Sequence, residues 1–153
     1  MAKIKYVNVD IYRTGVTIFV GTHNEFIKYL KDMASKKDYY KEIVPLAEDR
    51  DNTSVASFYW DAESRTLIVE VTSLKFNYRT LGEVVHELDH AAFYILDECG
   101  VYYGPEDGSK EAHTYLLELL VKGTFNKEGY EVVWDFMAIT SIYTRVLVFM
   151  DKL

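Results

Sequence analysis

The segment TLGEVVHELDHAAFYIL, residues 80–96, decides the fold. Its apolar residues recur at intervals of three and four, which is the spacing of one face of an amphipathic α-helix. Within that pattern His86 and His90 are four residues apart, so both imidazoles lie on one face with Glu87 beside them. Two imidazoles at this spacing can bind one metal ion, and the adjacent carboxylate can act as a general base. The segment therefore predicts a metal-binding helix.

Signals for the start and the end of a helix flank this segment. Thr80 followed three residues later by Glu83 is typical of a capping box, and Gly100 is suited to a left-handed C-terminal cap. We expect a helix of roughly seventeen residues between these signals. The alternative is that His86 and His90 are ordinary histidines beside a core stripe, but they would then need other partners to be buried cheaply.

A third metal ligand should come from outside this helix. Glu111 lies 21 positions after His90, close to the start of a second helix that we expect to begin near Ser109. The connection contains Gly100, Gly104, Pro105 and Gly108, and it is long enough to fold the second helix back beside the first. Two histidines, one glutamate and one open position form a known arrangement of catalytic zinc.

His113 competes with Glu111 for this role. With an advance of about 100° per residue, the apolar residues of the second helix fill one broad arc, and His113 falls near the middle of that arc. Amphipathicity alone therefore turns His113 toward an apolar surface and Glu111 away from it. If Glu111 binds the metal, His113 is a core histidine.

The stretch HELDHA at residues 86–91, followed by EAHTYL at residues 111–116, resembles the thermolysin-type gluzincins. Their pattern is H-E-x-x-H, then a Glu followed by Ala on a second helix after a gap of similar length. The resemblance is closer to the small zincin-like proteins of phages and mobile elements than to a large secreted protease. The family often has an Asp four residues after the ligand Glu, where this chain has Tyr115.

The resemblance implies a zinc metallopeptidase in which His86, His90 and Glu111 bind Zn²⁺. Glu87 would be the general base that takes a proton from metal-activated water and passes it to the leaving amine. Tyr102 and Tyr103 occupy about the place where the family carries a tyrosine that stabilises the developing oxyanion. Because the chain has 13 tyrosines, packing of these two rings in a loop is the simpler explanation.

A second hypothesis is a zincin-like binding or structural protein, in which a metal clips two helices together or is absent. The small size of the chain and Tyr115 in place of Asp support it. A structural site has no need of a general base, so Glu87 favours the hydrolase. The expected partner is accordingly a polypeptide substrate, or a protein partner under the second hypothesis.

Composition and charge narrow these possibilities. A chain of 153 residues that is 49% hydrophobic is expected to form one domain, residues 1–153, with a sizeable core. The net charge of −7 argues against binding a nucleic acid. No apolar run is long enough for a membrane span. The single cysteine and the start MAKIKY, which lacks the apolar region of a secretory signal, predict an intracellular, cytoplasmic protein.

The remaining pattern predicts an α+β fold, a minimal zincin-like domain. Hairpins are expected at residues 3–12 with 15–20, and at residues 54–60 with 66–72, forming a small twisted antiparallel sheet ahead of the HExxH helix and the Glu-bearing second helix. Zincin-type peptidases bind an extended substrate along a strand edge above the motif helix. The second hairpin is the candidate for that edge, and simple core sheet is the alternative.

Three further segments complete the prediction. Thr22 followed by Glu25 predicts a capped helix after the first hairpin. Residues 38–53 are expected to be rich in loops, with Pro45 as a break. Residues 130–153 fit a C-terminal helix by periodicity, although their Val, Ile and Thr content would suit strands.

Overall fold

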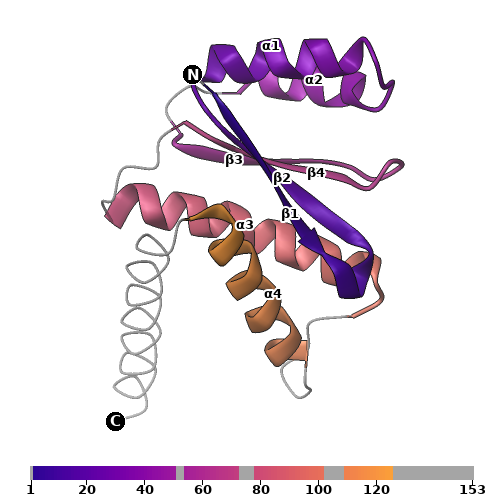
Figure 1. Ribbon diagram of the computed structural model, residues 1–153, viewed down its shortest axis with the longest axis vertical. Helices are drawn as coiled ribbons and strands as arrows, with labels where there is room; N and C mark the ends of the chain where they lie inside the picture. The colour runs from indigo at the N-terminus through magenta and orange to yellow at the C-terminus, as the bar shows by residue number, and fades with distance from the viewer. Residues whose placement is uncertain (1, 51–53, 73–77, 102–108, 126–153) are drawn as a thin grey trace.

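The structure, a computed structural model, describes residues 2–50, 54–72, 78–101 and 109–125. These residues form an α+β fold in three layers, with a sheet between two pairs of helices (Figure 1). In chain order the elements are β1 (Lys3–Val9), the 3-10 helix η1 (Asp10–Tyr12), β2 (Thr14–Val20), α1 (His23–Ala34), α2 (Tyr40–Glu48), β3 (Ala56–Asp61), β4 (Thr66–Val71), α3 (Tyr78–Glu98) and α4 (Ser109–Thr124).

The sheet has four strands in the order β1-β2-β4-β3. Both predicted hairpins are present and antiparallel, with Val7 opposite Val16 in the first and Phe58 opposite Val69 in the second. The hairpins join through a parallel pair, β2 and β4, so the sheet is mixed and the expectation of a wholly antiparallel sheet was wrong. Parallel neighbours need a long crossover, and here α1, α2 and β3 provide it.

Both faces of the sheet are buried, because β2 and β4 direct apolar side chains to each side in turn. One face packs on α1 and α2 around Phe19, Phe26, Leu30, Tyr40, Ile43, Ala47, Tyr59 and Ile68. The other packs on α3 and α4, with Val16, Ile18, Leu67, Val69 and Val71 from the sheet and Leu88, Ala92, Ile95, Leu120 and Val121 from the helices. Burial on both sides fixes the register, since a slip of one residue would exchange the two faces.

The helices on the first face differ in how well local sequence predicts them. The capping box that begins α1 is confirmed, with Thr22 N–H donating to Glu25 at 2.9 Å and Glu25 N–H donating to the Thr22 hydroxyl at 3.3 Å. The expectation of a loop-rich segment at residues 38–53 was wrong, because α2 contains Pro45 within it. Pro45 removes one helical hydrogen bond, and burial of Ile43 and Ala47 offsets that loss.

The HExxH helix, α3, begins before the predicted capping box. Its first residue is Tyr78, and Thr80 lies buried inside the first turns. Glu83 accepts a hydrogen bond from the backbone N–H of Val55 at 2.7 Å and one from Arg79 at 2.9 Å, and these donors lower the pKa of its carboxyl. Glu83 therefore anchors the chain just ahead of β3 to α3, and the capping box prediction was wrong.

The predicted end of α3 at Gly100 is confirmed. Gly100 has a φ of +72°, and its N–H donates to the carbonyl of Asp97 at 2.9 Å while Val101 N–H donates to that of Leu96 at 2.8 Å. This pair of bonds is the Schellman arrangement, which satisfies carbonyls at the end of the helix.

The helix predicted for residues 130–153 lies outside the described residues. Within the described part of the chain, no helix has both the length and the apolar character needed to cross a bilayer.

A buried charged network lies between the sheet and the α1–α2 layer. The Glu70 side chain is fully buried and accepts hydrogen bonds from Arg50 and, at 3.2 Å, from the Tyr59 hydroxyl. His23 Nδ1 lies 2.9 Å from its other oxygen. Burial, together with the Glu70 charge, raises the pKa of Tyr59 to about 12, so the phenol remains neutral and able to donate.

We predict that Glu70→Ala destabilises the fold by about 3–5 kcal/mol, because it leaves the Arg50 guanidinium buried without its carboxylate. Urea unfolding followed by circular dichroism would measure the loss. Glu63→Ala, which removes an exposed carboxylate from the β3–β4 turn, is the control and should change stability by less than about 0.5 kcal/mol. Equal stability of the two variants would contradict the role given to the network.

Candidate metal centre

The two histidines of the motif converge on the exposed side of α3. His86 Nε2 and His90 Nε2 lie 3.1 Å apart, and the ring centroids are separated by 4.5 Å. Two nitrogens bound to one tetrahedral zinc ion at about 2.0–2.1 Å are separated by about 3.3 Å. At the observed distance one ring can donate a hydrogen bond to the other, or both can hold one cation. The pair therefore fits two ligand positions of a zinc ion.

Burial of one face of α3 leaves these two side chains exposed on the other. Leu88, which lies between them in the sequence, is fully buried against the sheet, as is Val84. Residues two apart on a helix point about 200° away from one another, so burying Leu88 turns His86 outward. His90, four residues after His86, shares its face.

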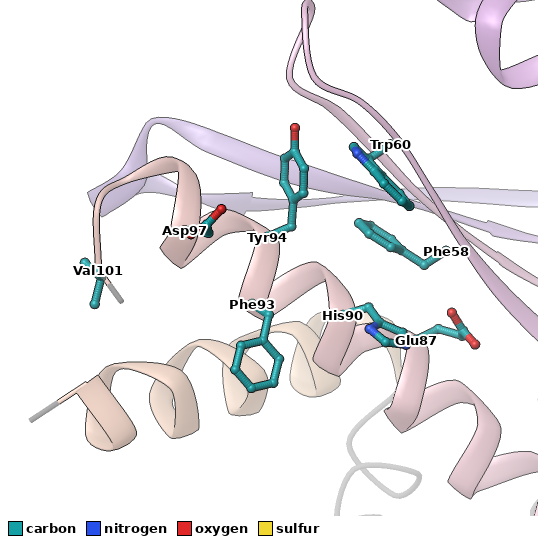
Figure 2. Close-up of a pocket in the computed structure, with 8 residues that line it drawn as sticks. All are labelled: Phe58, Trp60, Glu87, His90, Phe93, Tyr94, Asp97 and Val101. Carbon is teal, nitrogen blue, oxygen red and sulfur yellow. The ribbon is translucent and has the colours of Figure 1, made fainter. Parts of the chain in front are cut away.

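An aromatic groove of about 600 Å³ lies beside the pair, between β3 and α3. Figure 2 shows Phe58 and Trp60 projecting from β3 toward the helix, where Tyr94 and His90 face them. The Phe58 ring is close to parallel with the His90 imidazole, at an angle of 18° and a centroid distance of 6.4 Å. His90 therefore belongs both to the histidine pair and to the lining of the groove.

Acidic side chains mark the two ends of the groove. Glu87 is half-buried and lines the groove next to His90, and its carboxylate lies at the end of the groove away from Tyr94 and Asp97 (Figure 2). Asp97 lies near the far end, toward Val101. Ten residues of helix separate Glu87 from Asp97, which corresponds to about 15 Å. The groove is therefore long enough to receive more than one residue of an extended chain.

β3 is at an edge of the sheet. Among the described residues it pairs with β4 alone, so its other side has backbone donors and acceptors without strand partners. This edge borders the groove, since Phe58 and Trp60 belong to β3. The sequence predicted an edge from the second hairpin here, but the aromatic lining of the groove was not predicted. Their alternation in β3, at positions 58 and 60, was the available signal.

Glu111 and His113 differ in exposure, as the helical pattern predicts. Glu111 lies in the first turn of α4 and is exposed, whereas His113 is buried. His113 packs on Phe93 with ring centroids 4.3 Å apart, and its Nε2 lies 3.1 Å from a carboxylate oxygen of Asp89. Asp89, a variable position of the motif, thereby holds α4 against α3.

The structure does not bring Glu111 to the histidine pair. Among the described residues, no three His, Cys, Asp or Glu side chains gather into a group that could hold a metal ion. Glu111 as third ligand therefore stays a prediction, and His113 contacts Asp89 instead of the pair. Tyr102 and Tyr103 lie outside the described residues.

Comparisons with known proteins do not assign the chain to a family. Neither models of protein families, nor curated proteins, nor solved structures gave a match. The interpretation of the site therefore rests on its own residues and on the motif resemblance.

We predict that the protein purified without chelators carries about one equivalent of zinc, because His86 and His90 are already spaced for one ion. The double variant His86→Ala/His90→Ala should lose it, and elemental analysis would measure both. Glu63→Ala, which removes an exposed carboxylate from the β3–β4 turn, is the control and should keep its zinc. Wild-type protein that contains no zinc, and takes none up from solution, would contradict the prediction.

A second pair of variants tests whether Glu111 or His113 is the third zinc ligand. If Glu111 is the third ligand, Glu111→Gln should weaken zinc binding by about 10-fold or more, whereas His113→Asn should leave the zinc affinity unchanged. A competitive chelator titration would give both affinities. The opposite result would assign the third ligand to His113 and would refute Glu111.

Proposed function

We propose that this protein is a zinc-dependent metallopeptidase that hydrolyses peptide bonds at the groove between β3 and α3. The observation that carries the proposal is the 3.1 Å separation of His86 Nε2 and His90 Nε2, with Glu87 lining the adjoining groove. In the proposed site His86 and His90 hold the zinc ion, and Glu111 is the third ligand implied by the motif resemblance. Bound zinc would supply a Lewis acid that polarises the substrate carbonyl and lowers the pKa of a water molecule.

The groove and the strand edge support a polypeptide as the substrate. An extended chain can pair with the outer edge of β3 through main-chain hydrogen bonds, which bind without regard to sequence. Phe58 and Trp60 project from this strand beside Tyr94 of α3, so side chains of the bound segment would meet an aromatic surface. An edge strand next to the metal-binding helix matches the substrate-binding arrangement expected of a zincin-like domain.

Glu87 is the proposed general base. Its half-burial beside His90, at the lining of the groove, supports this role. In the proposed reaction Glu87 accepts a proton from the attacking water and donates it to the leaving amine. Tyr102 or Tyr103 remains the predicted donor to the developing oxyanion. The single cysteine supports a cytoplasmic location for this activity.

A second candidate is a zincin-like binding protein, and the position of Glu111 favours it. In the described part of the chain the histidine pair is not joined by a third acidic, histidine or cysteine ligand. The same groove and strand edge would then hold a partner polypeptide without cleaving it.

The Glu87→Gln variant distinguishes the metallopeptidase from the binding protein. The substitution keeps the shape of the side chain and leaves both histidines free, so zinc content and thermal stability should be unchanged. Hydrolysis of unfolded protein substrates, read as fragments by mass spectrometry, should fall by about 10² to 10⁴-fold. Glu98→Gln, an exposed position on the same helix, is the matched control and should retain full activity. Wild-type protein with full zinc that cleaves no peptide in a broad library would favour the binding protein.

A further inference from the structure

A second hollow, of about 490 Å³, lies on the other face of the sheet from the histidine pair. Gly15, Thr17 and Thr66 contribute to it from β2 and β4, on the side where Phe19 and Ile68 pack against α1 and α2. Its volume falls within the range of about 300–1,000 Å³ that small-molecule sites occupy. It shares no lining residue with the aromatic groove.

Three cationic side chains line this hollow, and they come from three separate turns. Arg13 immediately precedes β2, Arg65 immediately precedes β4, and Lys37 lies between α1 and α2. Because β2 and β4 are parallel neighbours with Val16 opposite Leu67, the starts of both strands lie at one end of the sheet. The crossover that makes the sheet mixed thus puts both arginines at the same end of the sheet. No carboxylate is among the described residues that line the hollow. Arg65 Nε also lies 3.5 Å from the Glu98 carboxylate of α3, an exposed pair that a bound anion would have to replace.

The backbone at both arginines is unusual. Arg13 has a φ of 51° and Arg65 a φ of 54°, and they are the only non-glycine residues with positive φ in the described part of the chain. This left-handed conformation is strained for a branched or long side chain, and glycine or asparagine is the usual occupant. Strained backbone conformations cluster at binding sites, where the surrounding structure holds a residue in place because its side chain is needed there.

Tyrosine rings form the walls of the hollow. The tip of the Tyr6 ring lies over Gly15, where a Cβ would be 2.5 Å from the Tyr6 hydroxyl oxygen and 2.7 Å from the backbone oxygen of Val7. The backbone contact leaves no room for a larger residue at this position. On the opposite wall Lys37 Nζ lies 5.7 Å from the centroid of the Tyr39 ring, a cation–π contact that keeps the ammonium beside the hollow. Tyr6 is largely exposed, so its ring can stack on a planar group.

The surroundings restrict the size of a ligand. An adjoining hollow shares Tyr39 and Ser64 with this one but is lined by acidic residues, Asp38, Glu42, Asp61 and Glu63. A polyanion that extended from the cationic hollow past Tyr39 and Ser64 would meet these carboxylates, and the chain carries a net charge of −7. The cationic hollow therefore suits a compact anion.

We propose that this hollow binds a small organic phosphate that carries a planar ring, the chemistry of a nucleotide. The guanidinium groups of Arg13 and Arg65 hold the phosphate through charge-assisted hydrogen bonds, with Lys37 as a third positive charge. The Tyr6 ring stacks on the planar group. The site is independent of the histidine pair, so it does not rest on the proposed hydrolysis.

The test is isothermal titration calorimetry of the whole chain at low salt with pyrophosphate, adenosine 5′-monophosphate and uncharged adenosine. We expect the two phosphates to bind and adenosine to bind at least about 10-fold more weakly than its monophosphate. Arg13→Gly/Arg65→Gly should weaken both phosphates by about 10-fold or more. Its thermal midpoint should be unchanged or higher, since glycine relieves the strain at both positions and the Arg65–Glu98 pair that it removes is a surface contact.

Two further variants complete the design. Tyr6→Ala should weaken the nucleotide but not pyrophosphate, because it removes only the stacking surface. Lys3→Ala/Lys28→Ala, which removes the same number of positive charges from exposed positions elsewhere, should bind as the wild type does. The proposal is overturned if neither phosphate binds, if the double glycine variant binds as well as the wild type, or if adenosine matches its monophosphate. Tighter binding of a single-stranded oligonucleotide than of the mononucleotide would also overturn it.

Discussion

Burial of Leu88 under the sheet is the constraint on which the candidate metal centre depends. Leu88 lies in the middle of the HExxH sequence and has no exposed surface, so the helix cannot rotate about its axis without exposing it. With that rotation fixed, His86 and His90 face outward and Glu87 turns toward β3. Complete burial of a leucine side chain contributes about 1.5–3 kcal/mol, and Val84, Ala91 and Ile95 are buried in the same core cluster. The geometry of the pair is thus a consequence of core packing.

The aromatic groove and the cationic hollow lie on opposite faces of the same sheet. On one face α3 and α4 create the aromatic groove next to the edge strand β3. On the other, the cationic hollow lies between the starts of β2 and β4 and the segment that joins α1 to α2, which contains Lys37 and Tyr39. The Glu70 network stands between β4 and the α1–α2 layer, where Arg50 and His23 meet the buried carboxylate. Its polar groups need one another, since any of them alone would be costly to bury.

The sequence predicted those elements that are specified by residues close together in the chain. Both hairpins, the capping box of Thr22 with Glu25, and the glycine at the end of α3 depend on neighbouring residues, and all are present. Two expectations failed for a common reason. Pro45 lies within a helix because the apolar face of α2 is buried, and Glu83 binds the Val55 amide, which is distant in sequence. In both cases tertiary contacts outweighed a local preference.

The sequence by itself determined the histidine pair, because a spacing of four residues on a helix fixes which side chains share a face. It also determined that His113 would be buried and Glu111 exposed, since the apolar arc of α4 surrounds the histidine. Only the tertiary structure decided what lies beside these residues. The parallel pairing of β2 with β4, the aromatic wall on β3 and the Asp89–His113 contact all join segments far apart in the chain. No local pattern encodes such contacts, because they depend on which buried faces pack together once the whole core has formed.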